Sequence, residues 1–313
     1  MNRSTTALLF PGQGSQTPGM GRDFAEAYAA SGQIFDQADQ ILGRSISKLC
    51  FEGSEENLRQ TVNTQPALYV TSAAILAAMR SEGIDGSMAA GHSLGEYTAL
   101  YAAGALDFET GLRLVDVRAR AMEEAGRKMP GTMAALIGLE PEKIAKACQE
   151  ASTVGIVGPA NWNSQQQAVI SGQPEAVDRA IELAKEAGCK KAIKLNVGGA
   201  FHSPLMLPAV DPLHAALCDA KINSPNLKFV ANVNAKFLSD PEAIRASLED
   251  QILKCVDWVD TILAMAQAGA NYFIEVGTGG VLTGLNKRID KSLNSLSLST
   301  VQELKNLCEA KLS

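Results

Sequence analysis

The stretch Ser87-Met88-Ala89-Ala90-Gly91-His92-Ser93-Leu94-Gly95 joins a short apolar segment to a helix-forming one through a turn that places a serine between two glycines. Its last five residues match the G-x-S-x-G pattern of a nucleophile elbow, in which a strand ends, the serine is exposed and a helix begins. We expect a strand over 87–90 and a helix from about Leu94. Glycine suits both positions because so sharp a turn leaves no room for Cβ atoms beside the serine. The Ser93 hydroxyl would then lie at the positive end of a helix, where a developing oxyanion is stabilised. The pentapeptide alone occurs by chance in many proteins, so an ordinary glycine turn stays open as the alternative.

Strand-like apolar runs recur on both sides of this stretch, between helical segments. They cover residues 7–10, 88–91, 133–139, 168–171, 229–233 and 272–276. Their alternation with helices favours an α/β architecture with a mostly parallel sheet. Among the helices, residues 67–80 are predicted to follow a cap at Thr64 with Pro66 in the first turn, and residues 107–124 have helical periodicity.

The middle of the chain has a different order of elements. A strand over 133–139, a helix over 141–151, strands near 155–161 and 167–171, a helix over 174–188 and a strand over 190–197 follow one another. This βαββαβ order is typical of a ferredoxin-like unit. We therefore predict a large α/β subdomain in two segments, 1–129 and 198–313, with a small ferredoxin-like subdomain, 130–197, inserted between them. The polar tail after about Asp290 is expected to pack loosely.

Composition excludes several classes of protein. Of the 313 residues 46% are hydrophobic and 20% are charged, which is ordinary for a folded soluble chain, and no apolar run reaches the roughly 18 residues of a membrane helix. The net charge of −6 argues against a nucleic-acid binder. The first residues break from an apolar run into Pro11-Gly12 without a secretory h-region, so a cytoplasmic protein is expected.

The six cysteines are scattered and form no C-x-x-C pair, so neither a zinc site nor a disulfide framework is expected. Two glycine-rich loops, 10–16 and 277–280, follow predicted strands but lack the spacing of a dinucleotide or nucleotide loop. We expect both loops to form the rim at the carboxyl end of a parallel sheet, where ligands bind.

A nucleophilic serine needs a base, and the chain has three histidines. His92 adjoins the serine in a tight turn, where successive side chains diverge, and His214 lies in a helical stretch where a surface or satisfied histidine is expected. His202 follows the inserted unit in a loop that can face a cleft between the subdomains. We assign His202 as the general base, and a structural histidine at a helix start stays the alternative.

Arg118 lies in an otherwise apolar stretch of the helix predicted over 107–124. From periodicity alone a solvated arginine, paired with a neighbouring acid, is the favoured interpretation.

Four ordered motifs change that interpretation. Taken together, residues 10–16 (FPGQGSQ), 91–96 (GHSLGE), 117–118 (VR) and 199–206 (GAFHSPLM) resemble the malonyl-CoA:acyl carrier protein transacylase family of fatty acid synthesis. The resemblance runs from about Leu8 to about Arg288. It implies a hydrolase-like large subdomain with a ferredoxin-like insertion, as the element order predicts.

The resemblance also implies a role for particular residues. Ser93 would be the acylated nucleophile, His202 its base and Arg118 the partner of the malonyl carboxylate. The backbone N–H groups of Gln13 and Leu94 would form the oxyanion hole, and the backbone carbonyl of Gln251 would orient His202 in place of the acid of a hydrolase triad. Phe201 resembles the malonyl rather than the methylmalonyl pattern of related polyketide enzymes.

The implied reaction is a ping-pong transfer of malonyl from coenzyme A to the phosphopantetheine thiol of acyl carrier protein, with no metal or redox cofactor. The partners are malonyl-CoA and acyl carrier protein, without nucleic acid or membrane, and a monomer is expected. A basic rim for an acidic carrier is guessed at four positions, although a solvated surface residue is the favoured interpretation of each: Lys190, Lys191, Lys287 and Arg288.

Two departures from the family pattern concern the shape of the cleft: glutamines within residues 161–166, and Thr278 in place of a common proline. Three alternatives stay open: a serine hydrolase, a non-catalytic carrier-binding protein, and a stand-alone acyltransferase of a polyketide pathway.

Overall fold

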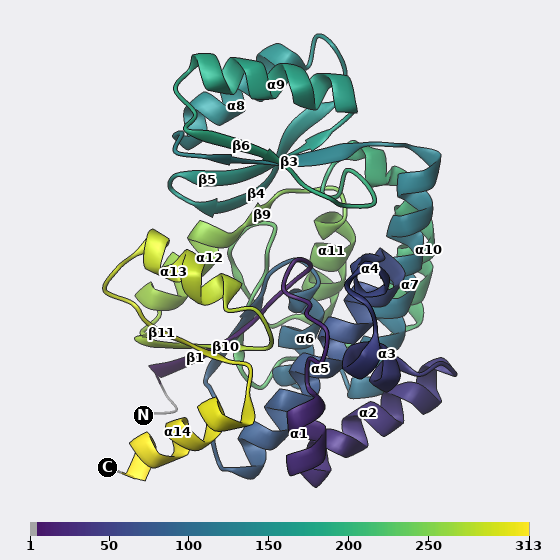
Figure 1. The fold of residues 1–313 in the computed structure, drawn as a ribbon, viewed down its shortest axis with the longest axis vertical. Helices are drawn as coiled ribbons and strands as arrows, with labels where there is room; N and C mark the ends of the chain where they lie inside the picture. The colour runs from purple at the N-terminus through teal and green to yellow at the C-terminus, as the bar shows by residue number, and fades with distance from the viewer. Residues whose placement is uncertain (1–4, 313) are drawn as a thin grey trace.

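Six strands form the sheet of the larger body of the molecule, in the order β11-β10-β1-β2-β7-β8. Every neighbouring pair is parallel except β7 and β8. In this computed structural model, which describes residues 5–312 and side chains up to residue 310, the sheet crosses the lower half of the view (Figure 1). The strands are β1 (Thr6–Phe10), β2 (Met88–Gly91), β7 (Lys228–Val230), β8 (Phe237–Leu238), β10 (Tyr272–Val276) and β11 (Asn294–Leu298).

Helices cover both faces of this sheet, which explains why its strands are short apolar runs. Along β1 the side chains alternate between two cores. Ala7 and Leu9 pack with α12 (Trp258–Gln267) and α13 (Val281–Ile289), while Leu8 and Phe10 belong to the core that contains α5 (Thr61–Ser81). The expected α/β class with a mostly parallel sheet is confirmed.

The remaining helices of the larger body pack around α5 and the sheet. They are α1 (Arg22–Ala27), α2 (Ala29–Leu42), α3 (Ile46–Glu52), α4 (Glu55–Arg59), α6 (Gly95–Ala102), α7 (Phe108–Lys128), the 3-10 helix η2 (Pro204–Ala209), α10 (Val210–Asp219), α11 (Pro241–Gln251) and α14 (Val301–Leu312). Asp107 caps α7, since its carboxylate accepts a hydrogen bond of 2.7 Å from the N–H of Thr110. None of the helices within residues 5–312 is long and apolar enough to cross a bilayer.

Helix α5 begins earlier than predicted. It starts at Thr61, Thr64 is not its cap, and Pro66 lies inside it. A proline has no N–H for the carbonyl four residues earlier, which here belongs to Val62. The guanidinium of Arg44 donates to that carbonyl at 2.8 Å instead, so the helix continues through the proline. The prediction of a cap at Thr64 is wrong because it assumed that the helix starts close to the proline. Arg44, in the segment between α2 and α3, supplies the missing donor and lets the helix start earlier.

The inserted segment forms the smaller lobe at the top of Figure 1. Its elements are β3 (Thr132–Ile137), α8 (Pro141–Ala151), β4 (Val157–Ser164), β5 (Gln167–Gly172), α9 (Pro174–Glu186) and β6 (Lys191–Lys194), the βαββαβ order expected. The sheet order is β6-β3-β5-β4-β9, and the pairs within the inserted segment are antiparallel. Strand β9 (Val256–Asp257) comes from the second segment of the larger body and runs parallel to β4, so this sheet extends beyond residues 130–197.

The tail after Asp290 is not loosely packed, and this prediction is wrong. Strand β11 pairs with β10 along its whole length, and α14 follows it. Leu298 and Leu304 are fully buried, and Leu307 is nearly so. The sequence did not predict β11 because serine alternates with leucine along it, so the strand contains no apolar run. The prediction that the first residues form no secretory h-region falls partly on residues 1–4, which lie outside the described residues.

Candidate active site

Ser93 lies at a sharp turn between β2 and α6, where its backbone adopts φ 51°. Both flanking glycines are required by close approach. A Cβ atom on Gly91 would lie 1.9 Å from the carbonyl oxygen of Gly95, and a Cβ atom on Gly95 would lie 2.0 Å from that of Phe10. The turn therefore has the geometry of a nucleophile elbow, in which the hydroxyl stands above the carboxyl ends of the parallel strands.

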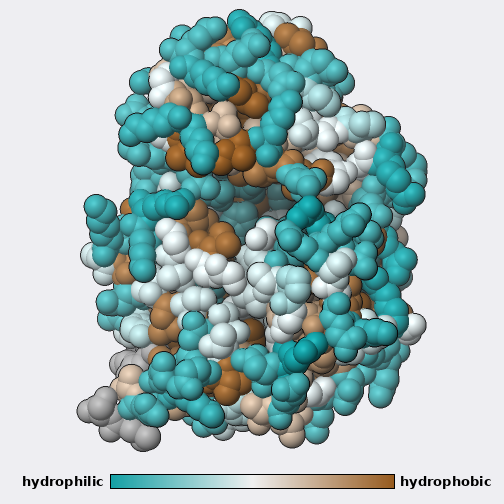
Figure 2. All heavy atoms as spheres, in the orientation of Figure 1, coloured by the Kyte–Doolittle hydropathy of each residue, from teal (hydrophilic) through white to brown (hydrophobic). Residues whose placement is uncertain are grey.

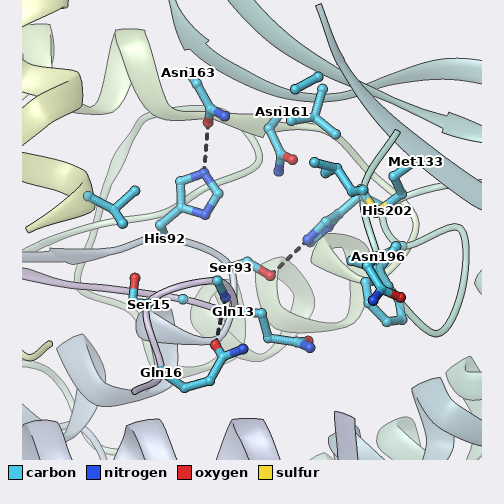
Figure 3. Close-up of a pocket in the computed structure, with 18 of the residues that line it drawn as sticks. Gln13, Ser15, Gln16, His92, Ser93, Met133, Asn161, Asn163, Asn196 and His202 are labelled. Carbon is cyan, nitrogen blue, oxygen red and sulfur yellow. Dashed lines mark hydrogen bonds between the residues drawn. The ribbon is translucent and has the colours of Figure 1, made fainter. Parts of the chain in front are cut away.

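His202 meets Ser93 from the loop that returns from the smaller lobe. The Oγ of Ser93 and the Nε2 of His202 are 2.8 Å apart (Figure 3). The other ring nitrogen, Nδ1, lies 2.8 Å from the backbone carbonyl of Gln251. A carbonyl can only accept, so Nδ1 carries the proton and Nε2 is left as the acceptor for the serine hydroxyl. The structure thus brings together Ser93, His202 and Gln251 in the arrangement that the resemblance implies.

The charge state of His202 follows from its surroundings. The ring is buried, and burial together with the nearby Arg118 guanidinium lowers the pKa of His202 to about 3. The hydrogen bond to Gln251 opposes this shift without cancelling it. The imidazole is therefore neutral near pH 7, as a general base must be.

The other two histidines lie elsewhere. His92 points away from the serine, and its Nε2 lies 2.9 Å from the Oδ1 of Asn163 (Figure 3). Burial lowers the pKa of His92. His214 lies on α10, exposed to solvent, with its Nδ1 2.8 Å from the carboxylate of Glu249. Both positions agree with the sequence-based expectations.

Arg118 is fully buried beside the serine, so periodicity alone misjudged it. Its Nη2 donates to the Oγ of Ser93 at 3.1 Å and to the side-chain oxygen of Gln251 at 2.8 Å, and its Nη1 donates to the side-chain oxygen of Gln65 at 2.7 Å. All three acceptors are uncharged, and Arg118 takes part in none of the ion pairs of the described residues. Its buried Nε has no hydrogen-bond partner in the described part of the chain.

A buried cation is costly unless an anion compensates its charge. Here the compensation is partial, because Glu96 acts on Arg118 through its charge without forming an ion pair with it. Burial lowers the pKa of Arg118. The guanidinium is nevertheless protonated near neutral pH, since an arginine does not lose its proton in proteins. Arg118 is therefore prepared to receive a carboxylate in a bidentate contact.

Glu96 is the buried acid nearest in sequence to the elbow, and the sequence analysis did not single it out. One carboxylate oxygen accepts from the N–H of Asn232 at 3.1 Å, and the other accepts from the side-chain amide of Gln251. Burial raises the pKa of Glu96 to about 7 against the opposing effects of these hydrogen bonds and of Arg118. Glu96 therefore does not carry a full negative charge at neutral pH.

A cavity of about 510 Å³ opens at the serine and runs between the two lobes. Figure 2 shows this face of the molecule hollowed between the upper lobe and the larger body. The lining includes residues of the loop after β1, the elbow, the hairpin of β4 and β5, and the His202 loop: Gly12, Gln13, Gly14, Ser15, Gln16, His92, Ser93, Met133, Asn161, Asn163, Asn196, Phe201 and His202, among others.

The structure describes both residues that are expected to supply the oxyanion donors. Gln13 lies in the cavity wall after β1, and Leu94 directly follows the serine. Neither backbone N–H donates to another group within residues 5–312. The loop 277–280 contacts the loop that follows β1, since the Thr278 hydroxyl donates to the carbonyl of Ser15 at 2.7 Å. Both glycine-rich loops thus lie at the rim of the parallel sheet.

Three residues of the site were missed by sequence reasoning: Gln65, Glu96 and Asn232. Gln65 and Asn232 come from α5 and from the loop after β7, far from the motif, and no local pattern marks them. Glu96 directly follows the elbow pentapeptide, so its proximity could have been inferred. The four guessed basic residues, Lys190, Lys191, Lys287 and Arg288, are all exposed, and none lines the cavity.

Comparison with known proteins agrees with this geometry. The model of the acyl transferase domain family matches residues 7–305. The chain belongs to this family. A malonyl CoA-acyl carrier protein transacylase of Escherichia coli strain K12 is 43% identical to this acyltransferase over 294 residues, which cover 94% of the chain and 95% of the relative.

Solved structures resemble the acyltransferase over its whole length. The crystal structure of an acyl carrier protein S-malonyltransferase from Vibrio cholerae has 42% sequence identity and a TM-score of 0.93, covering 97% of this chain and 100% of that one. A malonyl-transacylase solved in complex with a type II polyketide synthase acyl-carrier protein has 40% identity and a TM-score of 0.95, covering 98% and 100%. The predicted fold class and family are confirmed.

Proposed function

We propose that this acyltransferase transfers malonyl from coenzyme A to the phosphopantetheine thiol of acyl carrier protein, in fatty acid biosynthesis, through an ester on Ser93. The observation that supports the acyl group most directly is Arg118, a fully buried guanidinium that donates to the Ser93 hydroxyl and forms no ion pair within the described residues. A free carboxylate on the acyl group would compensate this charge. An acetyl group carries no charge and would leave the guanidinium without an ion-pair partner.

The first half of the reaction follows from the hydrogen bonds of the site. The Oγ of Ser93 attacks the thioester carbonyl while the Nε2 of His202 takes its proton, and Nδ1 stays bonded to the carbonyl of Gln251. The N–H groups of Gln13 and Leu94 are the proposed donors to the tetrahedral oxyanion. When the intermediate collapses, the C–S bond breaks, His202 returns the proton to the thiolate, and free coenzyme A leaves.

The second half runs the same steps in reverse. The phosphopantetheine thiol gives its proton to His202 and attacks the malonyl ester, and Ser93 recovers the proton as its C–O bond breaks. No step needs a metal ion or a redox cofactor.

The orientation of His202 by an uncharged carbonyl bears on the competition with water. A Ser-His pair without a buried carboxylate activates water less than a hydrolase triad does, because the imidazolium formed during attack is less stabilised. We therefore expect the malonyl ester to survive until the carrier thiol arrives. Phe201, buried in the cavity wall beside His202, limits the space for a branched acyl chain.

The identity of the carrier is a separate part of the proposal. A relative was solved in complex with a type II polyketide synthase carrier, and loading a polyketide carrier would require the same chemistry. Incubating the malonylated enzyme with each type of carrier and weighing the products distinguishes the two pathways. We propose further that the enzyme acts as a monomer in the cytoplasm, and its six free thiols fit a reducing compartment.

The central test is intact-mass analysis after incubation with malonyl-CoA. The wild type should gain the mass of one malonyl group, Ser93→Ala should gain none, and Arg118→Ala should lose its preference for malonyl-CoA over acetyl-CoA. Rapid hydrolysis of the acyl-enzyme in buffer without an acceptor thiol would instead indicate a serine hydrolase. Arg113→Ala, an exposed position on the same helix, is the matched control.

A further inference from the structure

Asn232 is a fully buried residue in the loop after β7, and all four of its polar groups are engaged. Its side-chain oxygen accepts from the N–H of Ser93 at 2.7 Å, and its side-chain nitrogen donates to the carbonyl of Gly91 at 2.7 Å. Its backbone N–H donates to Glu96 and its backbone carbonyl accepts from Asp257 at 2.8 Å. One amide therefore bridges the two sides of the elbow, while its own backbone is fixed from both directions.

The bridge matters because the elbow is strained. At φ 51° Ser93 adopts the left-handed region that residues with a side chain rarely occupy, and it does so only where the surroundings impose it. The Asn232 amide is matched to this turn: it supplies an acceptor to the N–H on one side and a donor to the carbonyl on the other. A relaxed turn would move the Ser93 hydroxyl away from His202 and rotate the following N–H.

The same bridge decides which backbone groups can face a substrate. The N–H of Ser93 is occupied by Asn232, so it cannot donate to a substrate oxyanion. The next N–H, that of Leu94, makes no hydrogen bond within the described residues. The direction of the Leu94 N–H is therefore set by the turn that Asn232 holds.

We propose that Asn232 is a positioning residue for acyl transfer, which holds the Ser93 turn through its side-chain amide and so aims the Ser93 hydroxyl at the base and the Leu94 N–H at the oxyanion. This role rests on the proposed function of Ser93. Asn232 touches neither the substrate cavity nor His202, so its effect is on the rate of acylation and not on substrate binding.

The test compares Asn232→Leu, which keeps similar volume without polar groups, with Asn232→Asp. Asn234, an exposed residue of the same loop, supplies the matched controls Asn234→Leu and Asn234→Asp. The rate of Ser93 acylation is measured by rapid-quench intact mass with malonyl-CoA, and malonyl-CoA binding is measured by calorimetry in a Ser93→Ala background. Circular dichroism and thermal unfolding verify that each variant is folded.

Asn232→Leu should acylate at least about 100-fold more slowly, as loss of an oxyanion donor does, with binding little changed. Asn232→Asp should respond to pH in a way that a purely structural role would not produce. A protonated carboxyl group can donate to Gly91 and accept from Ser93, as the amide does, whereas an ionised one can only accept. Glu96 on α6 accepts from the backbone N–H of residue 232, and the backbone N–H of Asp257 on β9 donates to its carbonyl. Arg118 on α7 acts on Glu96 through its charge. Acylation by Asn232→Asp should therefore approach the wild-type rate at low pH and fall as pH rises, while the controls follow the wild type.

Wild-type acylation rates in folded Asn232→Leu would overturn the proposal. If Asn232→Leu does not fold, Asn232→Asp decides alone, and a pH profile equal to that of the wild type would overturn it. Failure of the wild type to be acylated by malonyl-CoA would instead contradict the proposed function. The reaction of Ser93 with a fluorophosphonate probe would then test the positioning role separately, with equal rates in wild type and Asn232→Leu counting against it.

Discussion

Ser93 Oγ has two polar neighbours, and one of them lowers the basicity of the other. His202, at 2.8 Å, is the proposed base for its proton, and Arg118, at 3.1 Å, is a cation that would stabilise the resulting oxygen anion. The same cation lowers the pKa of His202 and so weakens the base. A carboxylate bound to Arg118 would offset that effect, because its negative charge opposes the guanidinium. The base would then be strongest when an acidic acyl group is in place.

This coupling predicts that Arg118→Gln raises the pKa of His202. Removal of the positive charge leaves burial as the main effect that disfavours the imidazolium, so the shift is upward from about 3 but stays below the ordinary value. The measurement is an NMR titration of the ring resonances, with His202→Ala to assign them among three histidines. Arg113→Gln, on the exposed side of the same helix, is the control and should leave the titration unchanged. An unaltered His202 titration in Arg118→Gln would show that the two side chains are not coupled.

At the scale of elements, α5, β11 and α14 are stabilised by residues that are distant from them in the sequence. Helix α5 continues through Pro66 because Arg44 donates to the carbonyl that the proline leaves without a partner. The last two elements, β11 and α14, are short and partly polar, and they are stabilised by pairing with β10 and by burial of a few leucines. In both places the local sequence pattern predicts less regular structure than the chain forms, because the stabilising partner is distant in sequence.

Leu304 provides a test of how firmly α14 is packed. It is fully buried in the main core, so Leu304→Ala should lower the free energy of unfolding by about 2–4 kcal/mol. Lys305→Ala, at the exposed neighbouring position, should change it by less than about 0.5 kcal/mol. Urea denaturation followed by circular dichroism gives both values. Equal effects of the two substitutions would mean that α14 contributes little to the folded core.

The whole molecule brings the site residues predicted from the sequence together from five separate parts of the chain. The loop after β1 contributes Gln13, the elbow Ser93, α7 Arg118, the loop after β6 His202, and the end of α11 Gln251. The smaller lobe closes the cavity from above and shares its sheet with β9 of the larger body. Folding of the whole chain is needed to bury charged and titratable groups together, and that burial makes stability depend on pH.

Glu96 shows this dependence most clearly. Its pKa is about 7 in the folded protein and about 4.5 when unfolded, so the folded state binds the proton more tightly. The stability contributed by this protonation is fully present below pH 4.5 and is lost as the pH rises through 7. Glu96→Gln removes the titration while keeping the shape of the side chain and one of its two acceptor oxygens.

The free energy of unfolding of Glu96→Gln, relative to wild type, should therefore rise by about 2–3 kcal/mol between about pH 5 and about pH 8, at roughly 1.4 kcal/mol for each unit of pKa shift. Urea denaturation of both proteins at the two pH values measures this difference. Glu186→Gln, at an exposed position of α9, is the control. A pH-independent difference between wild type and Glu96→Gln would mean that Glu96 is not held in its protonated form by the fold.

The sequence by itself determined the elements that depend only on residues close together in the chain. The elbow needs two glycines at fixed spacing, and periodicity places β1, β2, β10 and the βαββαβ order of the inserted segment. The ordered motifs also predicted the family and named Ser93, His202, Arg118, Gln13, Leu94 and Gln251 as the site. Their catalytic roles stay predictions until the variants above are measured.

Only the tertiary structure decided the environment of these residues. Arg118 is buried because its side of α7 packs against α5 and the elbow, although an arginine in a helix is expected to be solvated. Asn232 and Gln65 enter the site from loops and helices with no motif. Burial, charge compensation and hydrogen-bond partners depend on which segments meet in space. A local sequence pattern predicts the conformation of a segment, but it does not predict which other segments pack against it.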